Sequence, residues 1–169
     1  MKTNYKKQTL NEGYSIIEFL IVMAIIGILA TISIPHIIKY FRFYKYENYA
    51  TQLELLTRQA KILAMTKSIN VGICVANDRT VKLINKGTER GGGICTGDQI
   101  KVLEINAEDS SYIKFSGSGF SLDPRGFAIF SGNVCIENSE DNSYFLICVS
   151  RFGGIRTERG SGGCRSCTE

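Results

Sequence analysis

The sequence predicts an α+β protein in which one long amino-terminal helix packs on a mostly antiparallel β head. The stretch from Phe19 to Ile38 is apolar and contains no Asp, Glu, Lys or Arg. A stretch with helical periodicity follows it, and beyond Ser68 the chain changes to short strands bounded by turns. The 169 residues leave room for one helix and one compact head, and not for two domains.

Residues 1–13 form a short basic leader in front of the apolar stretch. Its three lysines outnumber its single glutamate, which biases this end toward the cytoplasm and predicts that the rest of the chain is exported. An ordinary secretory signal has its small-residue cleavage site after the apolar region, whereas here Lys39 and aromatic residues follow. The small residue that fits a processing point is Gly13, so cleavage would make Tyr14 the new amino terminus.

Residues 14–38 are predicted to form a transmembrane and assembly helix that carries one carboxylate, Glu18. An acid at bilayer depth costs roughly 3 kcal/mol, so Glu18 needs a cationic partner. Cleavage after Gly13 would place the ammonium of Tyr14 close to it. The alternative is an interfacial side chain that reaches the lipid headgroups.

The segment from Gly13 to Ile21 (GYSIIEFLI), the apolar run from Met23 to Ala30 and Pro35 resemble the leader of type IV prepilins and type II secretion pseudopilins. The resemblance implies that a prepilin peptidase cleaves after the glycine and methylates Tyr14, where the family usually has Phe. It also implies that Glu18 meets the amino terminus of a neighbouring subunit during filament assembly. A plain signal anchor is the alternative.

Residues 39–67 are predicted to continue the helix as an amphipathic half that lies against the head. Its apolar face consists of Leu53, Leu56, Ala60 and Leu63. Pro35 should kink the helix, with Thr31 and Ser33 placed to satisfy the freed carbonyls. A cluster of aromatic and basic residues fits a membrane-interface belt, with base stacking as the alternative. The cluster consists of Lys39, Tyr40, Phe41, Arg42, Phe43, Tyr44, Lys45, Tyr46 and Tyr49.

Residues 68–169 are predicted to form the β-rich head with a carboxyl-terminal tail rich in cysteine and arginine. Two glycine-rich stretches, 87–97 and 117–119, are expected to be loops. The last three expected strands should form a meander. The expected strands are 70–75, 80–84, 100–105, 112–115, 127–130, 134–137 and 144–150.

Several pieces of the head are similar to FimT/GspH-type minor pilins and pseudopilins. These pieces are 56–64 leading into 71–74, the turn 123–126, and 146–150 followed by 152–156. The resemblance implies a minor pilin that promotes assembly of a type IV pilus. Its partners would be other pilin subunits, the prepilin peptidase and the inner membrane, with the head in the periplasm before it joins the pilus or pseudopilus. The alternative is a type II secretion pseudopilin that acts in protein export without DNA binding.

Some members of this group bind DNA through a carboxyl-terminal Gly-Arg-x-Arg element. Here Gly153, Ile155 and Arg156 match that element, while Gly154 stands in place of its first arginine. DNA capture for uptake is the second hypothesis, and a solvated loop and strand edge is the alternative. The candidate DNA-binding residues are Arg151, Arg156, Arg159 and Arg165. The formal net charge of +4 falls to +2 when the leader's three lysines and one glutamate leave, so global charge gives no argument for nucleic acid.

Six cysteines in an exported head predict disulfides in an oxidising compartment. We expect Cys135 to pair with Cys148 across a hairpin, and Cys74 to pair with Cys95. The last two cysteines would then close a tight terminal loop through Cys164 and Cys167. A redox role for this Cys-x-x-Cys is disfavoured because it opens no helix beneath a βαβ unit.

The sequence predicts no catalysis, no cofactor, no metal and no small-molecule substrate. The only histidine, His36, lies beside Pro35 in the apolar span, so it cannot build a Ser-His-Asp or Cys-His site in the head. A zinc site at the terminal Cys-x-x-Cys would need two further ligands. No glycine loop follows a strand and precedes a helix in the way a phosphate-binding loop does. The chain is therefore expected to be a filament component and a substrate of processing enzymes.

Overall fold

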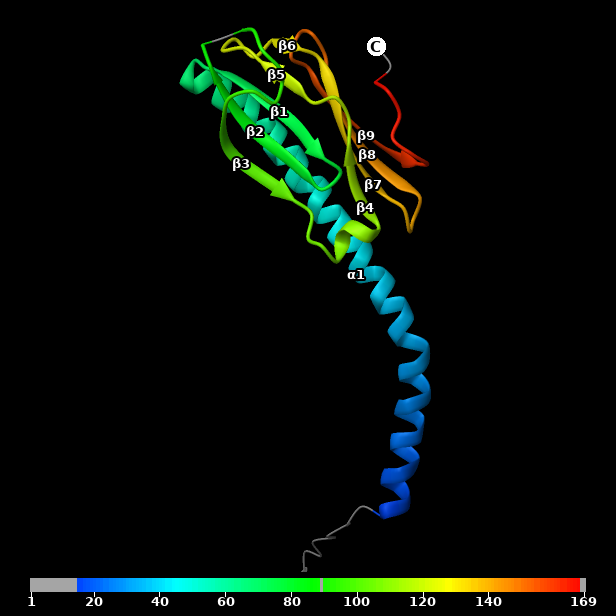
Figure 1. The fold of residues 1–169 in the computed structure, drawn as a ribbon. Helices are drawn as coiled ribbons and strands as arrows, with labels where there is room; N and C mark the ends of the chain where they lie inside the picture. The colour runs from blue at the N-terminus through cyan, green and yellow to red at the C-terminus, as the bar shows by residue number, and fades with distance from the viewer. Residues whose placement is uncertain (1–14, 89, 168–169) are drawn as a thin grey trace, which may run out of the picture. The chain divides into compact units, whose positions relative to one another are not determined.

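The computed structural model describes residues 15–88 and 90–167 (Figure 1). Gly13 and Tyr14, the expected processing residues, lie outside the described residues. The chain divides into two compact units, Met1–Phe41 and Arg42–Glu169. The first unit contributes the amino-terminal part of the long helix, and the second contains the rest of that helix and the β head.

Helix α1 runs from Ile16 to Lys67 and confirms the expected long helix. It is the one helix in the described part of the chain that is long and apolar enough to cross a membrane. The large apolar side chains from Ile16 to Ile38 are all exposed. An exposed apolar surface of this length is unusual for a soluble helix, because such a helix buries its apolar face.

Pro35 lies inside α1 and does not end it. The Thr31 hydroxyl donates to the Ile28 carbonyl at 2.7 Å, and the Ser33 hydroxyl donates to the Leu29 carbonyl at 2.9 Å. Neither bonds to the carbonyl of Thr31, which is the group that loses its partner to the proline. The expected compensation is therefore wrong, because a helical hydroxyl reaches back three or four residues and neither side chain can reach that carbonyl.

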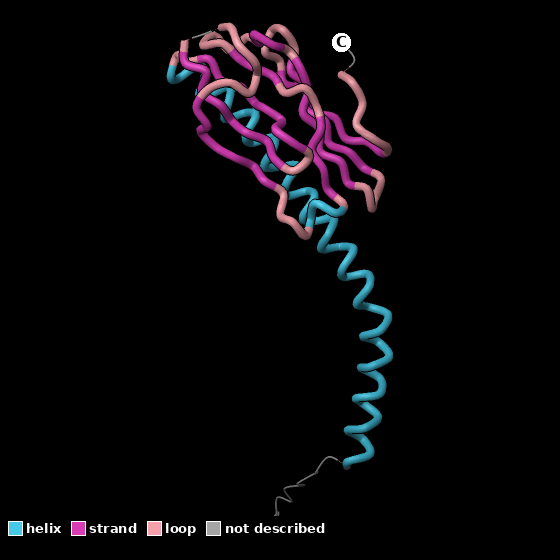
Figure 2. The backbone as a smooth tube through the Cα atoms, in the orientation of Figure 1, coloured by secondary structure: helices cyan, strands magenta, loops and turns pink. Residues whose placement is uncertain are grey.

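The described strands form two antiparallel sheets (Figure 2). The first sheet has the order β3-β2-β1-β5-β6, and the second has the order β4-β7-β8-β9. The strands are β1 (Asn70–Asn77), β2 (Thr80–Gly87), β3 (Asp98–Glu104), β4 (Ile113–Ser116), β5 (Phe120–Leu122), β6 (Ala128–Phe130), β7 (Gly132–Asn138), β8 (Ser143–Val149) and β9 (Ile155–Ser161). A short 3-10 helix, η1 (Asp109–Ser111), precedes β4.

The expected meander of the last three strands is wrong. Of these three strands, β6 pairs with β5 in the first sheet, and β7 and β8 form a hairpin in the second. The chain crosses between the sheets at Gly132, where a Cβ atom would lie 1.9 Å from the Gly119 carbonyl oxygen. Only glycine allows this close approach of two backbones. Strands β5 and β9 were not expected, since β5 is short and β9 alternates charges rather than apolar residues.

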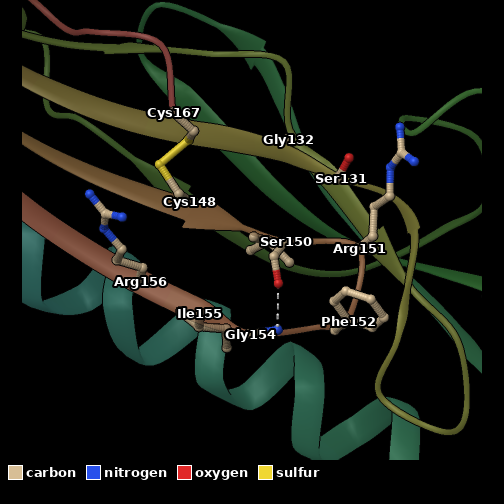
Figure 3. Close-up of a pocket in the computed structure, with 11 residues that line it drawn as sticks. Ser131, Gly132, Cys148, Ser150, Arg151, Phe152, Gly154, Ile155, Arg156 and Cys167 are labelled. Atoms are coloured by element: carbon tan, nitrogen blue, oxygen red, sulfur yellow. Dashed lines mark hydrogen bonds between the residues drawn. A yellow bond between two sulfur atoms is a disulfide. The ribbon is translucent and has the colours of Figure 1, made fainter. Parts of the chain in front are cut away.

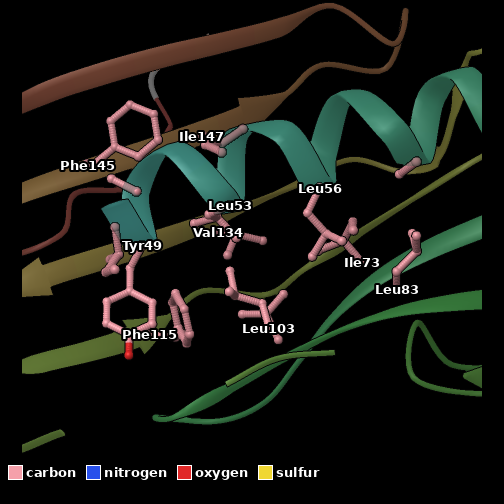
Figure 4. Close-up of a cluster of buried hydrophobic side chains, with 14 of the residues drawn as sticks. Tyr49, Leu53, Leu56, Ile73, Leu83, Leu103, Phe115, Val134, Phe145 and Ile147 are labelled. Carbon is pink, nitrogen blue, oxygen red and sulfur yellow. The ribbon is translucent and has the colours of Figure 1, made fainter. Parts of the chain in front are cut away.

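One core joins α1 to both sheets. Leu53, Ala50 and Ala60 of the helix are fully buried, and Leu56 is nearly so. Figure 4 shows Leu53 and Leu56 directed toward side chains of the strands, among them Ile73 of the first sheet and Val134 of the second. The expected apolar helix face is therefore confirmed.

The expected membrane-interface belt is wrong for its carboxyl-terminal members. Tyr46 and Tyr49 are buried in the head core rather than exposed at a lipid surface. Lys45 makes an ion pair with Asp109 at 2.8 Å, and Arg42 pairs with Glu140. These side chains therefore fasten the helix to the head. The aromatic members that remain exposed are Tyr40, Phe41, Phe43 and Tyr44.

Two buried carboxylates stabilise the head. Burial alone would raise the pKa of Asp109, but hydrogen bonds from Lys45, Tyr112 and Tyr49 outweigh it and hold that pKa below its ordinary value. The pKa of Asp123 is also held low, because Arg125 and two backbone N–H groups outweigh the effect of burial. Both carboxylates therefore favour the folded head only while they are ionised.

The head should lose stability in acid. The lowered pKa values mean that the stabilisation is complete above the unfolded-state pKa of about 4 and is lost as pH falls through the folded-state values. Asp109→Asn should lower the urea midpoint at neutral pH and flatten its fall in acid. Urea-dependent pulse proteolysis at a series of pH values measures both effects. An acid dependence identical to that of the unsubstituted chain would contradict this assignment.

Candidate functional site

Glu18 lies in the first turn of α1 and is exposed. Within the described residues its carboxylate has no hydrogen bond and no ion pair, while large apolar side chains surround it along the helix. A single exposed acid in such a surface suits contact with another molecule that supplies a cation. The expected partner, the amino group of Tyr14, lies outside the described residues.

Three disulfides tie the head, and one of them is the expected Cys74–Cys95 pair. The other two are Cys135–Cys164 and Cys148–Cys167. The expected Cys135–Cys148 and Cys164–Cys167 pairs are therefore wrong. Every cysteine is paired in the structure.

The strand register explains the correction. Cys135 lies opposite Leu146, whereas Cys148 lies opposite Asn133, so the two cysteines are offset by two residues on adjacent strands. A diagonal offset separates them by about 7 Å or more, which is beyond the usual span of a disulfide. Instead the segment after β9 crosses the outer face of the second sheet and reaches both. There Tyr144 and Leu146 are buried beside the cysteines.

A groove of about 800 Å³ lies where β8 turns into β9 (Figure 3). Its lining includes Arg151, Phe152, Ile155 and Arg156, together with the Cys148–Cys167 disulfide. The ring of Phe152 is 83% exposed at the turn, which is the highest exposure among the large apolar side chains of the described residues. The groove thus combines apolar surface with two guanidinium groups.

The turn that carries this groove is held in a fixed conformation. The Ser150 hydroxyl accepts a hydrogen bond from the Gly154 N–H at 3.1 Å, and Lys61 of α1 donates to the Gly153 carbonyl at 2.8 Å. Gly153 has a φ of +71°, and a Cβ there would lie 1.7 Å from the Gly126 carbonyl oxygen. The glycine is therefore required by the backbone contact as well as by its conformation.

The four candidate arginines do not form one patch. The register places Arg156 opposite Cys148 on the outer face of the sheet, and Arg159 opposite Phe145 on the face toward the helix. Arg159 pairs with Glu47 of α1 at 2.5 Å and lies over the Phe145 ring. Arg151 and Arg156 share the groove, whereas Arg165 is exposed between the two terminal cysteines.

No His, Cys, Asp and Glu side chains cluster in a way that could hold a metal ion within residues 15–88 and 90–167.

The sequence alone did not locate the groove, because its wall depends on a disulfide between segments whose pairing is not local. The one available signal was Phe152, an aromatic residue directly before Gly153 and Gly154. Sequence patterns predict poorly which segments pair when those segments are distant along the chain.

No protein-family model and no curated protein matches this sequence. Among solved structures, the chain is similar to two crystal forms of the type IV minor pilin FimU of Pseudomonas aeruginosa. The first has a TM-score of 0.52 and 14% identity, over 74% of this chain and 96% of that one. The second has a TM-score of 0.50 and 14% identity, over 72% and 99%. The minor pseudopilin EpsH of the Vibrio cholerae type 2 secretion system aligns with a TM-score of 0.44 and 9% identity, over 68% and 94%.

Proposed function

Because this chain has the fold of a type IV minor pilin, we propose that it is a filament subunit of the pilin and pseudopilin class. The observation that carries the proposal is the exposed, largely apolar surface of α1 from Ile16 to Ile38, in which Glu18 is the one Asp, Glu, Lys or Arg residue. Before assembly, the helix lies in the inner membrane with the head in the periplasm. On assembly, the apolar helices leave the lipid and pack together.

Within this class we propose a FimT/GspH-like minor pilin of a type IV pilus that promotes filament assembly. The likeness of the fold to the minor pilin FimU supports this role, and the helical members of the head's core run from Tyr46 to Ala64. A type II secretion pseudopilin uses similar parts and is the alternative. Neighbouring genes discriminate between them: retraction or competence genes favour the pilus, and secretion-channel genes favour export.

Processing at the leader tests the proposal. In cells that contain the prepilin peptidase, the mature chain should begin at an N-methylated Tyr14. Amino-terminal mass spectrometry of the membrane-bound protein measures this directly. Gly13→Leu should leave the full-length chain in the membrane, while the neighbouring control Glu12→Ala should be cleaved normally. An unprocessed chain in the presence of an active peptidase would contradict the proposal.

DNA capture stays a prediction for the basic tail, and its test concerns Arg151 and Arg156. These two guanidinium groups share the groove, whereas Arg159 is held by Glu47 and serves stability. In a gel shift with duplex DNA, Arg151→Ala plus Arg156→Ala should weaken binding several-fold, because each lost phosphate contact weakens it and lowers its salt dependence. Arg159→Ala should lower the urea midpoint of the head and leave binding unchanged. No shift with the unsubstituted chain would exclude this activity.

A further inference from the structure

Strand β9 is an edge of the second sheet, and its register with β8 shows which backbone groups are free. It pairs with β8 alone and without a bulge. The Ser150 N–H donates to the Gly154 carbonyl at 3.0 Å, and the Gly162 N–H donates to the Asn142 carbonyl at 2.7 Å. Hydrogen-bonded pairs alternate along an antiparallel ladder, so even-numbered residues of β9 bond to β8. Ile155, Thr157 and Arg159 therefore direct their N–H and C=O groups away from the sheet.

The other edges are less suited to accept a further strand. Strands β4 and β6 contain four and three residues, respectively, and β3 pairs with β2 through an irregular register. Strand β9 has seven residues in regular register. A regular edge of this length offers a row of unpaired donors and acceptors to a second chain.

The charges around this edge select the chemistry of that chain. Between residues 151 and 167 there are four arginines and one glutamate, Glu158. Glu158 accepts a hydrogen bond from the Tyr144 hydroxyl, and its contact with Arg156 is long at 3.7 Å. The Arg151 guanidinium has no partner within the described residues. The groove that this arginine lines lies next to the first residues of β9, with the exposed Phe152 ring on its border.

We propose that β9 is a docking edge for an extended, acidic segment of another polypeptide. The segment adds a strand to the sheet through the free groups of Ile155, Thr157 and Arg159. One of its apolar side chains enters the groove beside Phe152, and its carboxylates meet Arg151 and Arg156. Main-chain hydrogen bonds supply affinity in such strand addition, and the pocket and charges supply selectivity. This partner binding goes beyond filament assembly and does not depend on it.

Two peptide probes test the charge and the edge. Each is as long as β9 and carries a fluorescent label; one alternates valine with aspartate, and the other alternates valine with lysine. Binding is measured by fluorescence anisotropy to the mature chain in neutral phosphatidylcholine nanodiscs. The acidic probe should bind at least about tenfold more tightly than the basic probe.

Thr157→Pro removes one N–H that points away from β8, so no hydrogen bond to β8 is lost. A proline is tolerated at an edge position of this kind, where the N–H faces solvent. This substitution should weaken binding of the acidic probe about tenfold. The matched control Thr157→Val keeps the N–H and should bind like the unsubstituted chain. Unchanged binding in Thr157→Pro, with the urea midpoint retained, would overturn the docking edge.

Arg151→Ala plus Arg156→Ala should also weaken binding of the acidic probe about tenfold. The control is Lys114→Ala, which removes an exposed cation from the opposite edge strand and should leave this binding unchanged. Equal affinity for the acidic and basic probes would overturn the charge assignment. Duplex DNA that binds through the two arginines but is insensitive to Thr157→Pro, with no binding of the acidic peptide, would also overturn the proposal. The surface would then be one for nucleic acid. Because binding is measured on unassembled chains, failure here leaves the filament proposal untouched.

Discussion

Leu53→Ala should lower the free energy of unfolding of the head by about 3 to 5 kcal/mol. Leu53 is fully buried at the point where α1 meets both sheets, and Figure 4 shows its side chain close to Val134. Removing its outer carbons forfeits their burial and leaves a cavity that the disulfide-tied sheets cannot readily collapse to fill. Pulse proteolysis of the mature chain in urea measures the change.

Leu55→Ala is the matched control for this prediction. Leu55 lies two residues further along the same helix and is 52% exposed. The same chemical change there should alter the free energy of unfolding by no more than about 0.5 kcal/mol. Equal losses in the two variants would show that the helix does not pack on the head through the Leu53 face.

The sequence was sufficient to predict the helix and its buried face. Helical periodicity is local, so Leu53, Leu56 and Ala60 could be assigned to one face without knowledge of the head. The presence of a mostly antiparallel head could also be predicted, because short strands and turn residues alternate after Ser68. These local patterns agree with the tertiary packing.

The partners of the strands could not be predicted in the same way. Strand β6 was expected to pair with β7 in a meander, but Gly132 carries the chain from one sheet to the other. Strand β9 carries charges where an ordinary buried strand has apolar residues, because it is an edge. The disulfide error has the same origin: Cys135 and Cys148 lie on paired strands, and only the register shows that they are offset.

The candidate functional residues were predicted more accurately by type than by grouping. The basic tail is real, yet Arg159 lies on the opposite face of the sheet from Arg156 because side chains alternate along a strand. Tyr46 and Tyr49 were assigned to a lipid interface by composition, and tertiary packing places them in the core. Composition identifies what residues can do and does not show which face they occupy.

Glu18→Ala should strongly reduce entry of this chain into filaments. The carboxylate is exposed in an apolar helix surface and has no partner within the described residues, and the proposed role pairs it with a cation that another subunit supplies. Loss of a partner from a buried ion pair costs about 3 to 5 kcal/mol, which predicts a decrease of at least about tenfold in incorporation. Membrane insertion and leader cleavage should be unchanged, because neither needs that contact.

Two further variants separate charge from shape. Glu18→Gln keeps the length of the side chain and removes its charge, so it should fail like the alanine variant. Glu18→Asp keeps the carboxylate and should retain part of the incorporation. Glu104→Ala, which removes an exposed acid from the head, should assemble normally.

The most direct test is the amount of this chain in sheared, purified filaments, measured by mass spectrometry relative to the most abundant subunit. The unsubstituted chain should be present in processed form. Glu18→Ala and Glu18→Gln should fall at least about tenfold in filaments and remain at normal levels in the inner membrane. Absence of the unsubstituted chain from filaments, or normal incorporation of the Glu18→Ala variant, would contradict the proposed role.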